Sequence, residues 1–498
     1  MAGSSTRAAA PLATLIALAC ACGHASNASA PGPVDAAATD AGTADVDASD
    51  VQPGPCVITP PAPPDWRLQA DGQVLRDGLG RVVFLRGVDA GGRSKFAPYV
   101  PFDSASGQFT QALDQYMDRA ASWGIDAMRL VFTWAALEPT HGQDNAAWLA
   151  QYQQLVDAAW ARGIWTVVDF HQDVYSESFC GDGFPSWTIA DAGPPEHDCP
   201  DWSAEYLDDM AVQQAFDAFW ATGSTVMPEY LSAWDVMIGQ FKNEPGVVGF
   251  EPINEPAPGT QTQTTFESTT LTAFYTQMVA HMRQAAPDAL VFIDLPSTDG
   301  AFLTTSLQRP TGDGVVFAPH FYPPQVTPAE VLSNLQAWAM VGTSWNVPVF
   351  LGEFGQPNAT PGIVDYVTAC FGALDTLGMS GTQWEYSVST EEWNDESYEV
   401  VAADGGEYPV VQALVRPFAR AVAGGTIVQS WDPTTTTFSL SYAPTGGTTE
   451  VQLPSRAYPQ GSNVSITGGC YDTTTVPGKM LVQPVAGATQ VSLTIRPP

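Results

Sequence analysis

Short apolar runs alternate along most of the chain with longer segments in which apolar residues recur every three or four positions. The short runs are typical of buried strands, and the longer pattern is typical of amphipathic helices. The predicted strands are Arg81–Gly87, Ala127–Phe132, Trp165–Phe170, Val247–Phe250, Leu290–Asp294, Val315–Ala318, Val347–Leu351 and Gly381–Trp384. The predicted helices are Phe109–Trp123, Trp148–Arg162, Val226–Phe241, Thr270–Gln284, Pro328–Ala339 and Val364–Leu377. Eight strands separated mostly by helices predict an α/β fold, a (β/α)8 TIM barrel over residues 65–423.

The pattern changes at about Gly424, where Thr, Ser, Val and Pro become frequent and no helical period remains. Segments of alternating polarity follow at Thr437–Tyr442, Thr449–Leu453, Asn463–Thr467, Met480–Pro484 and Gln490–Ile495. Alternation with a period of two, interrupted by turn residues, predicts a small antiparallel β-sandwich over residues 424–498. Whether this sandwich binds sugar, binds a membrane or supports the barrel stays open.

The N-terminus has the pattern of an export signal over residues 1–22. Arg7 supplies positive charge, and the apolar run Ala8–Ala19 is too short to span a bilayer of about 30 Å. Cys20 or Cys22 is a candidate lipidated residue, so the alternatives are a secreted protein and an outer-surface or periplasmic lipoprotein of a bacterium. Residues 23–64 are rich in Ala, Asp and Pro, which predicts a disordered acidic tether.

The charge balance excludes some classes of partner. The chain has 498 residues, with 18 Lys and Arg against 53 Asp and Glu, and a net charge of -35. Nucleic acid is excluded as a partner because binding to phosphates requires a basic surface. An anionic membrane would repel the chain on average, but a local patch can still make transient contact with a lipid surface. The chain is predicted to be a monomer.

Five cysteines follow the signal, and an exported protein can keep disulfides. Cys180 and Cys199 flank a loop rich in Gly, Pro and Asp, so a bridge between them is the preferred pairing. Cys370 lies in an apolar helical pattern, which predicts a buried free thiol. The pairing of Cys56 and Cys470 stays open. No spacing of Cys and His is typical of a zinc site, and neither a metal nor a cofactor is expected.

Two glutamates carry the main chemical prediction. Glu255 lies in G-F-E-P-I-N-E-P and Glu353 in F-L-G-E-F-G, each just after a predicted buried strand. Glycoside hydrolysis with retention requires one protonated carboxyl group and one ionised carboxylate. Glu255 is the predicted acid/base and Glu353 the predicted nucleophile. Asn254, next to Glu255, is a candidate for binding the 2-hydroxyl of a sugar.

Other strand ends add four candidates. Arg129 can keep Glu353 ionised by charge pairing, and the hydroxyl of Tyr322, two residues after His320, can hydrogen bond to the same carboxylate. Trp384 offers an indole face on which a sugar ring can stack. The alternatives are an ordinary buried ion pair for Arg129 and simple packing for Trp384. Glu385 is a rival candidate for the acid, although loop carboxylates are usually just solvated.

These residues resemble glycoside hydrolase family 5 of clan A, and in particular its endoglycoceramidase-like branch. The matching motifs are F-L-R-G-V-D-A-G-G-R-S-K at Phe84–Lys95, V-V-D-F-H-Q-D-V-Y-S at Val167–Ser176, G-D-G-F-P-S-W at Gly181–Trp187, N-E-P-A-P-G, and the tail features F-S-L-S-Y, Pro454–Pro459 and Gly468–Gly469. H-Q-D-V-Y-S is the most specific of these motifs. Asp89 stands where the family more often has Asn. The resemblance covers residues 66–498.

The resemblance implies a hydrolase that cuts between the oligosaccharide and the ceramide of a glycosphingolipid, with Glu255 as acid/base and Glu353 as nucleophile. The residues implied around the sugar next to ceramide are Lys95, His171, Asp173, Asn254, His320 and Tyr322, with Trp384 beneath it. An apolar slot for ceramide is expected from Phe179, Phe184, Trp187, Ile189 and Trp202. Another β-glycosidase of the family (a β-glucanase, mannanase or glucosidase) and a non-catalytic glycan-binding protein are the alternatives.

Overall fold

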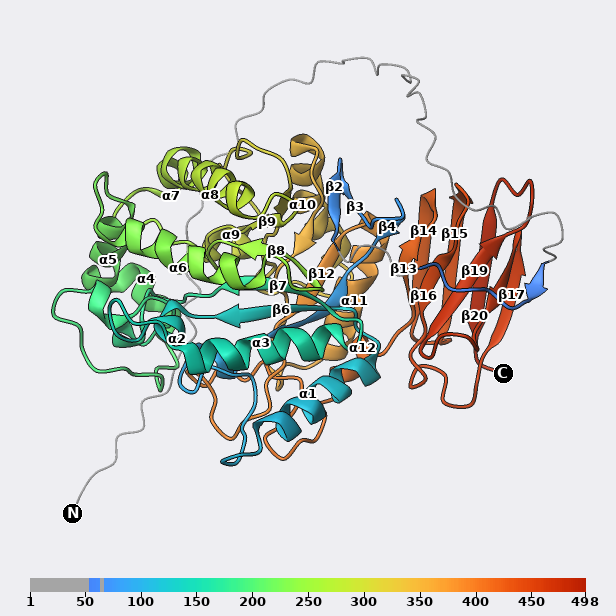
Figure 1. Ribbon diagram of the computed structural model, residues 1–498, viewed down its shortest axis with the longest axis horizontal. Coiled ribbons are helices and arrows are strands. Elements are labelled where there is room, and N and C mark those ends of the chain that lie inside the picture. The colour runs from blue at the N-terminus through green and yellow to red at the C-terminus, as the bar shows by residue number, and fades with distance from the viewer. Residues whose placement is uncertain (1–52, 63–66) are drawn as a thin grey trace. The chain divides into compact units, whose positions relative to one another are not determined.

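The computed structural model describes residues 53–62 and 67–498 (Figure 1). One sheet consists of eight parallel strands that neighbour one another in chain order, and β12 returns to pair with β5. These strands are β5 (Arg86–Ala90), β6 (Ala127–Phe132), β7 (Trp165–Phe170), β8 (Val247–Glu251), β9 (Leu290–Ile293), β10 (Val315–Phe317), β11 (Phe350–Leu351) and β12 (Ser380–Gln383). Parallel bridges from Phe317 to Val349 and from Phe321 to Phe354 join β10 to β11. The predicted TIM barrel is therefore confirmed.

Helices connect and cover the barrel strands. The α-helices are α1 (Phe109–Trp123), α2 (Trp134–Leu137), α3 (Ala146–Trp160), α4 (Glu205–Asp208), α5 (Met210–Trp220), α6 (Val226–Phe241), α7 (Gln263–Thr265), α8 (Thr272–Ala285), α9 (Ser297–Phe302), α10 (Val331–Trp345), α11 (Ile363–Leu377) and α12 (Val411–Leu414). Shorter turns are the 3-10 helices η2 (Gly92–Lys95), η3 (Glu177–Phe179), η4 (Ser186–Thr188) and η5 (Trp202–Ala204), and η6 (Phe266–Leu271) is a π-helix. Helix α3 packs against β7, and α11 against β12.

The boundaries of α1 illustrate why the periodic pattern was informative. Its buried side chains recur at Leu113, Tyr116, Met117 and Ala120, which is one face of a helix. The helix ends before Gly124, whose φ of 83° lies in the left-handed region that terminates helices and favours glycine. The burial of one face and a glycine stop together fix where α1 begins and ends.

Strands from before and after the barrel form two more sheets. One has the strand order β1-β18-β19-β16-β13-β4-β3-β2 and the other β14-β15-β20-β17. The strands are β1 (Gly54–Pro55), β2 (Gln69–Asp71), β3 (Val74–Arg76), β4 (Val82–Val83), β13 (Phe418–Val422), β14 (Gly424–Asp432), β15 (Thr437–Pro444), β16 (Thr449–Gln452), β17 (Asn463–Thr467), β18 (Gly469–Asp472), β19 (Lys479–Pro484) and β20 (Val491–Arg496). Phe438, Leu440, Val451, Met480 and Leu493 are buried in the shared core of these two sheets. The predicted β-sandwich is confirmed.

The prediction of one barrel strand at Arg81–Gly87 was wrong. Val82–Val83 pairs with β3 and β13 in the sandwich sheet, and the barrel strand begins only at Arg86. Both halves of this run are apolar because both are buried. They are buried in two different cores, but the sequence pattern alone looks like one continuous strand. The domain boundaries therefore differ from the predicted 65–423 and 424–498, since β2 to β4 and β13 belong to the sandwich sheet.

The end of the predicted tether is also structured. Gly54–Pro55 pairs in parallel with β18, Cys56 forms a disulfide with Cys470, and Ile58 is buried. The predicted disorder over 23–64 is therefore wrong for residues 53–62, because a backbone ladder and a covalent bond hold this short apolar segment. The predicted signal over 1–22, with Cys20 and Cys22, lies outside the described residues, as does most of the tether.

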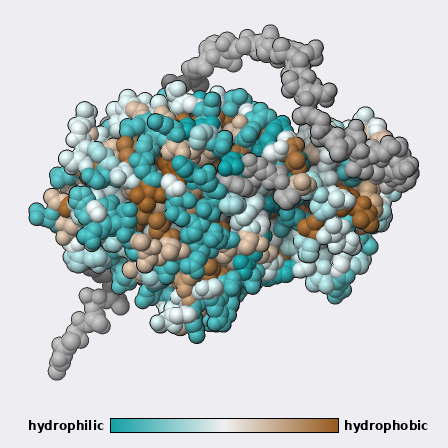
Figure 2. Space-filling view, viewed as in Figure 1, coloured by the Kyte–Doolittle hydropathy of each residue, from teal (hydrophilic) through white to brown (hydrophobic). Residues whose placement is uncertain are grey.

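The face of the molecule in Figure 2 is mainly hydrophilic, with hydrophobic residues scattered among hydrophilic ones. Exposed large apolar side chains include Leu207, Met210 and Phe302. Within residues 53–62 and 67–498, no helix combines the length and the apolar character needed to cross a membrane.

Candidate active site

Glu255 and Glu353 meet at the carboxyl ends of β8 and β11. One carboxylate oxygen of each glutamate and a ring nitrogen of His320 all lie within 4.8 Å of one another. Both glutamates are buried. Retaining glycosidases hold their two carboxyl groups about 5–5.5 Å apart, whereas inverting enzymes leave about 6.5–9.5 Å for a water molecule. The separation therefore fits direct attack by one carboxylate.

Glu353 receives two strong hydrogen bonds. Arg129 donates from Nη1 to Oε1 at 2.7 Å, and the Tyr322 hydroxyl donates to Oε2 at 2.9 Å. Burial raises the pKa of Glu353, and the neighbouring His320 ring and the charge of Arg129 oppose that rise. A carboxylate that accepts from a guanidinium and a phenol is stabilised in its ionised form. Glu353 thus has the environment expected of the nucleophile.

Arg129 is fully buried and lies at the centre of a group of acids. Its guanidinium forms a bidentate pair with Glu251, at 2.9 and 2.7 Å, and also donates to Asn254 Oδ1 at 2.8 Å. Asp169 and Asp89 lie 3.1 and 3.5 Å from it. The alternative of an ordinary ion pair and the predicted contact with Glu353 are therefore both present in one network.

Glu255 has fewer partners for its carboxyl group. His320 Nδ1 lies 2.8 Å from Oε1, and the same ring nitrogen is 3.5 Å from Glu353 Oε2. Burial, followed by the negative charge of Asp173, raises the pKa of Glu255 to about 8, against the opposing effect of Lys95. A carboxyl group with this pKa is protonated at neutral pH, as a general acid requires.

The side chain of Asn254 is engaged within the protein. Its oxygen accepts from Arg129, and its Nδ2 donates to the Gln172 carbonyl at 3.1 Å. Gln172 in turn donates to the backbone carbonyls of Asn254 and Glu255, at 2.9 and 3.0 Å. This reciprocal pair fixes the turn that carries Glu255. The predicted contact of Asn254 with a sugar hydroxyl stays a prediction.

The remaining predicted sugar-binding residues form a second group. Lys95 Nζ is 2.7 Å from Asp173 Oδ2 and lies 4.6 Å from the centre of the Trp384 ring. The His171 ring stacks on Trp384 at 5.2 Å, and its Nδ1 is 2.8 Å from Asp169. All ten predicted site residues thus lie in two connected groups at one end of the barrel.

The charges in this second group are fixed. Burial opposes ionisation of Asp173, but Lys95 and His171 outweigh it and lower the pKa of Asp173 to about 2. Burial lowers the pKa of His171 to about 3, so the imidazole is neutral. Although burial lowers the pKa of Lys95, the charges of Asp173 and Glu396 raise it above its usual value. The three groups can therefore bind sugar hydroxyls without changing protonation near neutral pH.

Two groups of residues were missed from the sequence. Glu251 ends β8 four residues before Glu255, and its place at a strand end was a usable signal. Glu396 and Trp393 come from the long loop after β12, where Glu396 Oε1 is 3.3 Å from Lys95 Nζ and the Trp393 ring centre is 3.8 Å from it. That loop has no periodic pattern, so no signal placed it beside Lys95.

The predicted ceramide slot is only partly supported. Phe184 is fully buried and stacks on Tyr175 at 4.1 Å, so it belongs to the core and its prediction was wrong. Trp202 packs on Trp393 at 4.9 Å, on the side of Lys95. Trp187 is partly buried and donates to the Glu138 carbonyl. The aromatic residues of this loop therefore lie in different surroundings. Phe184 packs in the barrel core, whereas Trp202 packs beside the site.

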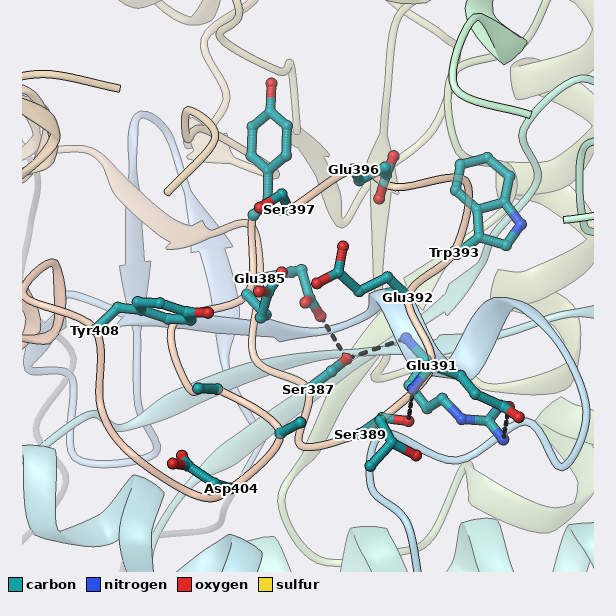
Figure 3. Close-up of a pocket in the computed structure, with 17 residues that line it drawn as sticks. Glu385, Ser387, Ser389, Glu391, Glu392, Trp393, Glu396, Ser397, Asp404 and Tyr408 are labelled. Atoms are coloured by element: carbon teal, nitrogen blue, oxygen red, sulfur yellow. Dashed lines mark hydrogen bonds and ion pairs between the residues drawn. The ribbon is translucent and has the colours of Figure 1, made fainter. Parts of the chain in front are cut away.

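Glu385 lies apart from the two glutamates. It lines a cavity of about 350 Å³ together with Glu396, Glu399 and Tyr408 (Figure 3). Its carboxyl group accepts from the Ser387 hydroxyl at 2.6 Å, and burial raises its pKa well above the usual range. Glu385 is therefore buried rather than solvated, and it does not join Glu353 as a rival acid.

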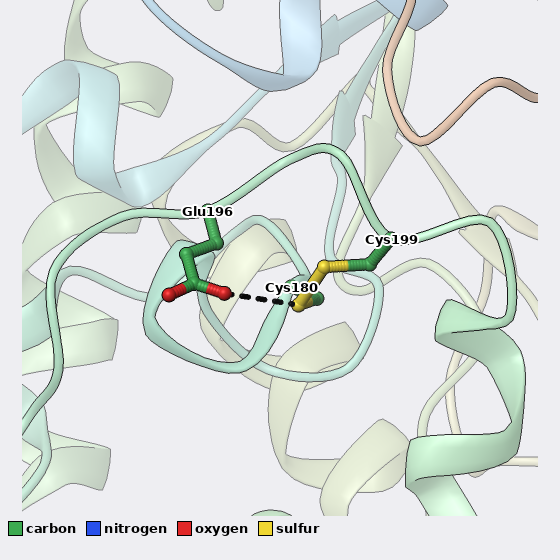
Figure 4. A group of neighbouring side chains, drawn as sticks. All are labelled: Cys180, Glu196 and Cys199. Atoms are coloured by element: carbon green, nitrogen blue, oxygen red, sulfur yellow. Dashed lines mark hydrogen bonds between the residues drawn. A yellow bond between two sulfur atoms is a disulfide. The ribbon is translucent and has the colours of Figure 1, made fainter. Parts of the chain in front are cut away.

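The cysteine predictions are confirmed for the residues concerned. Cys180 and Cys199 form a disulfide in the loop after β7, with Glu196 Oε2 3.8 Å from the Cys180 sulfur (Figure 4). Cys370 is a buried free cysteine in α11. The bridge closes the loop that carries Phe184 and Trp187, so it limits how far this loop can move from the site.

Three buried groups at the site have the ligand types of a cation site, among them His171, Asp173 and Asp182. The Lys95 ammonium already lies 2.7 Å from Asp173 and supplies positive charge there. The other two groups contain His320 with either Glu255 and Glu353 or Glu251 and Asp294. Glu251 and Glu353 of these groups pair with Arg129.

Two glutamates at this separation, at the strand ends of a (β/α)8 barrel, define the class of retaining glycoside hydrolases. The chain belongs to glycoside hydrolase family 5. Residues 94–390 match the family model described as cellulase (glycosyl hydrolase family 5), and residues 416–495 match the glycoside hydrolase family 5 C-terminal domain.

Similar proteins place the chain within the family. Endoglycoceramidase I from Rhodococcus hoagii (strain 103S) is 28% identical over 88% of this chain and 90% of that protein. An endoglycoceramidase from Hydra vulgaris is 29% identical over 37% of this chain and 40% of that protein. The structure of the lactosyl-enzyme intermediate of endo-glycoceramidase II from Rhodococcus sp. superposes with a TM-score of 0.71 at 25% identity, covering 86% of this chain and 100% of that one. The resemblance to the endoglycoceramidase branch is therefore confirmed.

Proposed function

We propose that this enzyme hydrolyses the bond between the oligosaccharide and the ceramide of glycosphingolipids, with retention of configuration. The observation that carries the proposal is the pair formed by Glu255 and Glu353, with oxygens within 4.8 Å. Similarity to endoglycoceramidases along nearly the whole chain supports the substrate class. A related structure holds a complex with ganglioside GM3, at 25% identity and a TM-score of 0.70.

In the first step, the Glu353 carboxylate attacks the anomeric carbon while Glu255 donates its proton to the oxygen of the leaving ceramide. The bond to ceramide breaks as the bond to Glu353 forms, which gives a glycosyl-enzyme intermediate. Arg129 and Tyr322 hold the attacking carboxylate through their hydrogen bonds at 2.7 and 2.9 Å. The high pKa of Glu255, about 8, keeps the required proton in place before this step.

In the second step, the ionised Glu255 accepts a proton from water, and the water oxygen attacks the anomeric carbon. The bond to Glu353 breaks, the free oligosaccharide is released and Glu255 is protonated again. Lys95, Asp173 and His171 bind sugar hydroxyls throughout, and Trp384 supports the face of the ring. No group beyond these side chains and water takes part in the proposed reaction.

A lipid surface is the proposed site of substrate capture. Tyr206 OH lies 3.5 Å from Asp173 Oδ1, and the neighbouring Leu207 and Met210 are 73% and 56% exposed. Apolar side chains this near the site can enter a membrane while the sugar is bound. In flotation with neutral vesicles, the variant Leu207→Ser/Met210→Ser should bind less than the unmodified enzyme. Equal binding would remove this part of the proposal.

Export is the proposed fate of the protein, and the two disulfides support it because such bonds persist outside the cytoplasm. Metabolic labelling with a fatty acid distinguishes secretion from a lipid anchor at Cys20 or Cys22. Radiolabelled palmitate would mark the anchored form and leave the secreted one unlabelled. A monomer is the proposed state, so light scattering on the purified protein should give the mass of one chain, which is 52.9 kDa before the signal is removed.

The deciding experiment is incubation of the purified protein, with Cys56 retained, with lactosylceramide and a ganglioside in mild detergent. Mass spectrometry should detect intact oligosaccharide and free ceramide. Stepwise loss of terminal sugars would contradict cleavage at ceramide. Cleavage of a β-glucan or an aryl β-glucoside with no action on either glycolipid would support another β-glycosidase of the family instead. The Glu353→Gln variant is the matched control.

A further inference from the structure

Asp294, at the end of β9, is a buried carboxyl group that the proposed reaction does not use. It is fully buried, and its Oδ2 accepts the backbone N–H of Glu255 at 2.8 Å. Its Oδ1 accepts the N–H of Leu295 at 2.6 Å. The same Oδ2 lies 3.3 Å from His320 Nε2. One carboxyl group therefore contacts both the backbone of the acid/base and the imidazole beside its side chain.

The backbone at Glu255 needs such support. Its φ is 37°, in the left-handed region that a residue with a side chain enters only with steric strain. This conformation turns the Glu255 side chain toward Glu353. The hydrogen bond from the Glu255 N–H to Asp294 is one of the contacts that hold the turn, together with those of Gln172 to the carbonyls of Asn254 and Glu255.

The His320 ring connects Asp294 to the carboxyl group of Glu255. Nδ1 lies 2.8 Å from Glu255 Oε1 and Nε2 lies 3.3 Å from Asp294 Oδ2. A neutral imidazole carries one proton, and the Asp294 oxygen 3.3 Å from Nε2, although outside hydrogen-bond geometry, favours the tautomer with that proton on Nε2, which leaves Nδ1 free to accept. The group that faces Nε2 thus determines whether Nδ1 accepts a hydrogen bond from Glu255 or donates one to it.

We propose that Asp294 is a positioning residue for the acid/base, acting on the Glu255 backbone directly and on its carboxyl group through His320. The inference rests on the retaining two-glutamate chemistry and is independent of whether ceramide is the leaving group. Asp294 holds the proton donor at the leaving oxygen and keeps that donor protonated. The nucleophile Glu353 is held mainly by Arg129 and Tyr322, and His320 lies farther from it, at 3.5 Å, than from Glu255, at 2.8 Å, so the effect on Glu353 is the smaller one.

Several other charged or titratable groups face this pair. Glu251 on β8 and Arg129 on β6 act on Asp294, and the Tyr275 hydroxyl on α8 donates to its backbone carbonyl at 2.9 Å. Asp173, Lys95, Arg129 and Glu251 act on Glu255. All of these groups are retained when Asp294 alone is changed, so a change in the acid/base can be assigned to Asp294.

The test compares Asp294→Asn with the unmodified enzyme on two aryl β-lactosides, one with a good and one with a poor leaving group. An amide cannot accept from both backbone N–H groups and from Nε2, so Glu255 loses part of its support. The kcat/KM on the poor leaving group should fall about 10–100-fold, less than the 10²–10⁴-fold that general acid catalysis contributes as a whole, because Glu255 itself is retained. On the good leaving group it should fall less than about threefold, because that substrate needs little proton donation.

The pH profile supplies a second readout. An amide at position 294 donates to Nε2, which places the ring proton on Nδ1 and favours the ionised form of Glu255. The basic limb of kcat/KM should therefore move to lower pH. Asp126→Asn is the matched control, because Asp126 is buried, accepts the Arg86 N–H at 2.9 Å and precedes β6 at the opposite end of the barrel. It should leave both readouts unchanged.

Either of two results would overturn the proposal. In the first, Asp294→Asn loses activity equally on both leaving groups with an unchanged basic limb, which would indicate a role in stability alone. In the second, Asp294→Asn retains full activity on both substrates. A melting curve of each variant identifies loss of folded protein, and activities are then expressed per folded molecule.

Discussion

The surroundings of Glu255 and of Glu353 differ although both residues are buried glutamates at strand ends of one barrel. Glu353 accepts hydrogen bonds from Arg129 and Tyr322, whereas the His320 ring is the only hydrogen-bond partner of the Glu255 carboxyl group within the described part of the chain. Two donors stabilise an anion, and burial with few donors stabilises a neutral acid. The proposed division of roles thus depends on the neighbouring side chains and not on the glutamates themselves.

The strongest test of the comparison removes the nucleophile. Glu353→Gln should lower kcat at least about 10⁴-fold on every substrate, because no attacking carboxylate remains for any leaving group. Steady-state kinetics on lactosylceramide and on a glycosyl fluoride measure it, and a circular dichroism spectrum checks folding. Substantial activity on either substrate would remove Glu353 from this role.

The second test removes the acid and should be selective. Glu255→Gln should lower kcat/KM about 10²–10⁴-fold on natural glycolipids, which need a proton at the leaving oxygen. A glycosyl fluoride, whose leaving group departs more easily, should be affected far less. Parallel kinetics on the two substrates give the ratio. If both rates fell by the same factor, the assignment of Glu255 as acid would be lost.

The third test uses pH. The pKa of Glu255 is raised to about 8, so the group is protonated below that pH and loses its proton above it. The kcat/KM on a substrate with a poor leaving group should therefore be maintained near neutral pH and fall as the pH rises through about 8. In Glu255→Gln with a glycosyl fluoride, this basic limb should be absent. A limb that persists in that variant would belong to another group.

The smallest expected effect concerns one donor to Glu353. Tyr322→Phe removes a hydrogen bond to an ionised carboxylate, which contributes about 1.5–3 kcal/mol, so kcat should fall roughly 10- to 100-fold. The loss should be equal for good and poor leaving groups, since the nucleophile acts on both. Tyr152→Phe is the control, because that hydroxyl donates to the Leu130 carbonyl. A loss in Tyr322→Phe confined to poor leaving groups would place Tyr322 with the acid.

Much of the barrel could be predicted because its elements follow local rules. The predicted bounds of α1 and α6 agree with the structure, and the strand ends led directly to Glu255 and Glu353. The run at Arg81–Gly87 was misread because apolar residues there enter two cores. Glu396 and Trp393 were missed because their place depends on how a long irregular loop folds back over Lys95. The sequence separation between Lys95 and this loop does not indicate that the two are in contact.

The disulfide between Cys56 and Cys470 joins residues 414 positions apart in the chain. It makes the barrel and most of the sandwich part of one covalent ring, with only residues 471–498 and the segment before Cys56 outside it. A force applied between the two ends of the chain passes from Cys56 through the sulfur bridge into β18, so the covalent path of that load leaves out the residues that form the catalytic barrel.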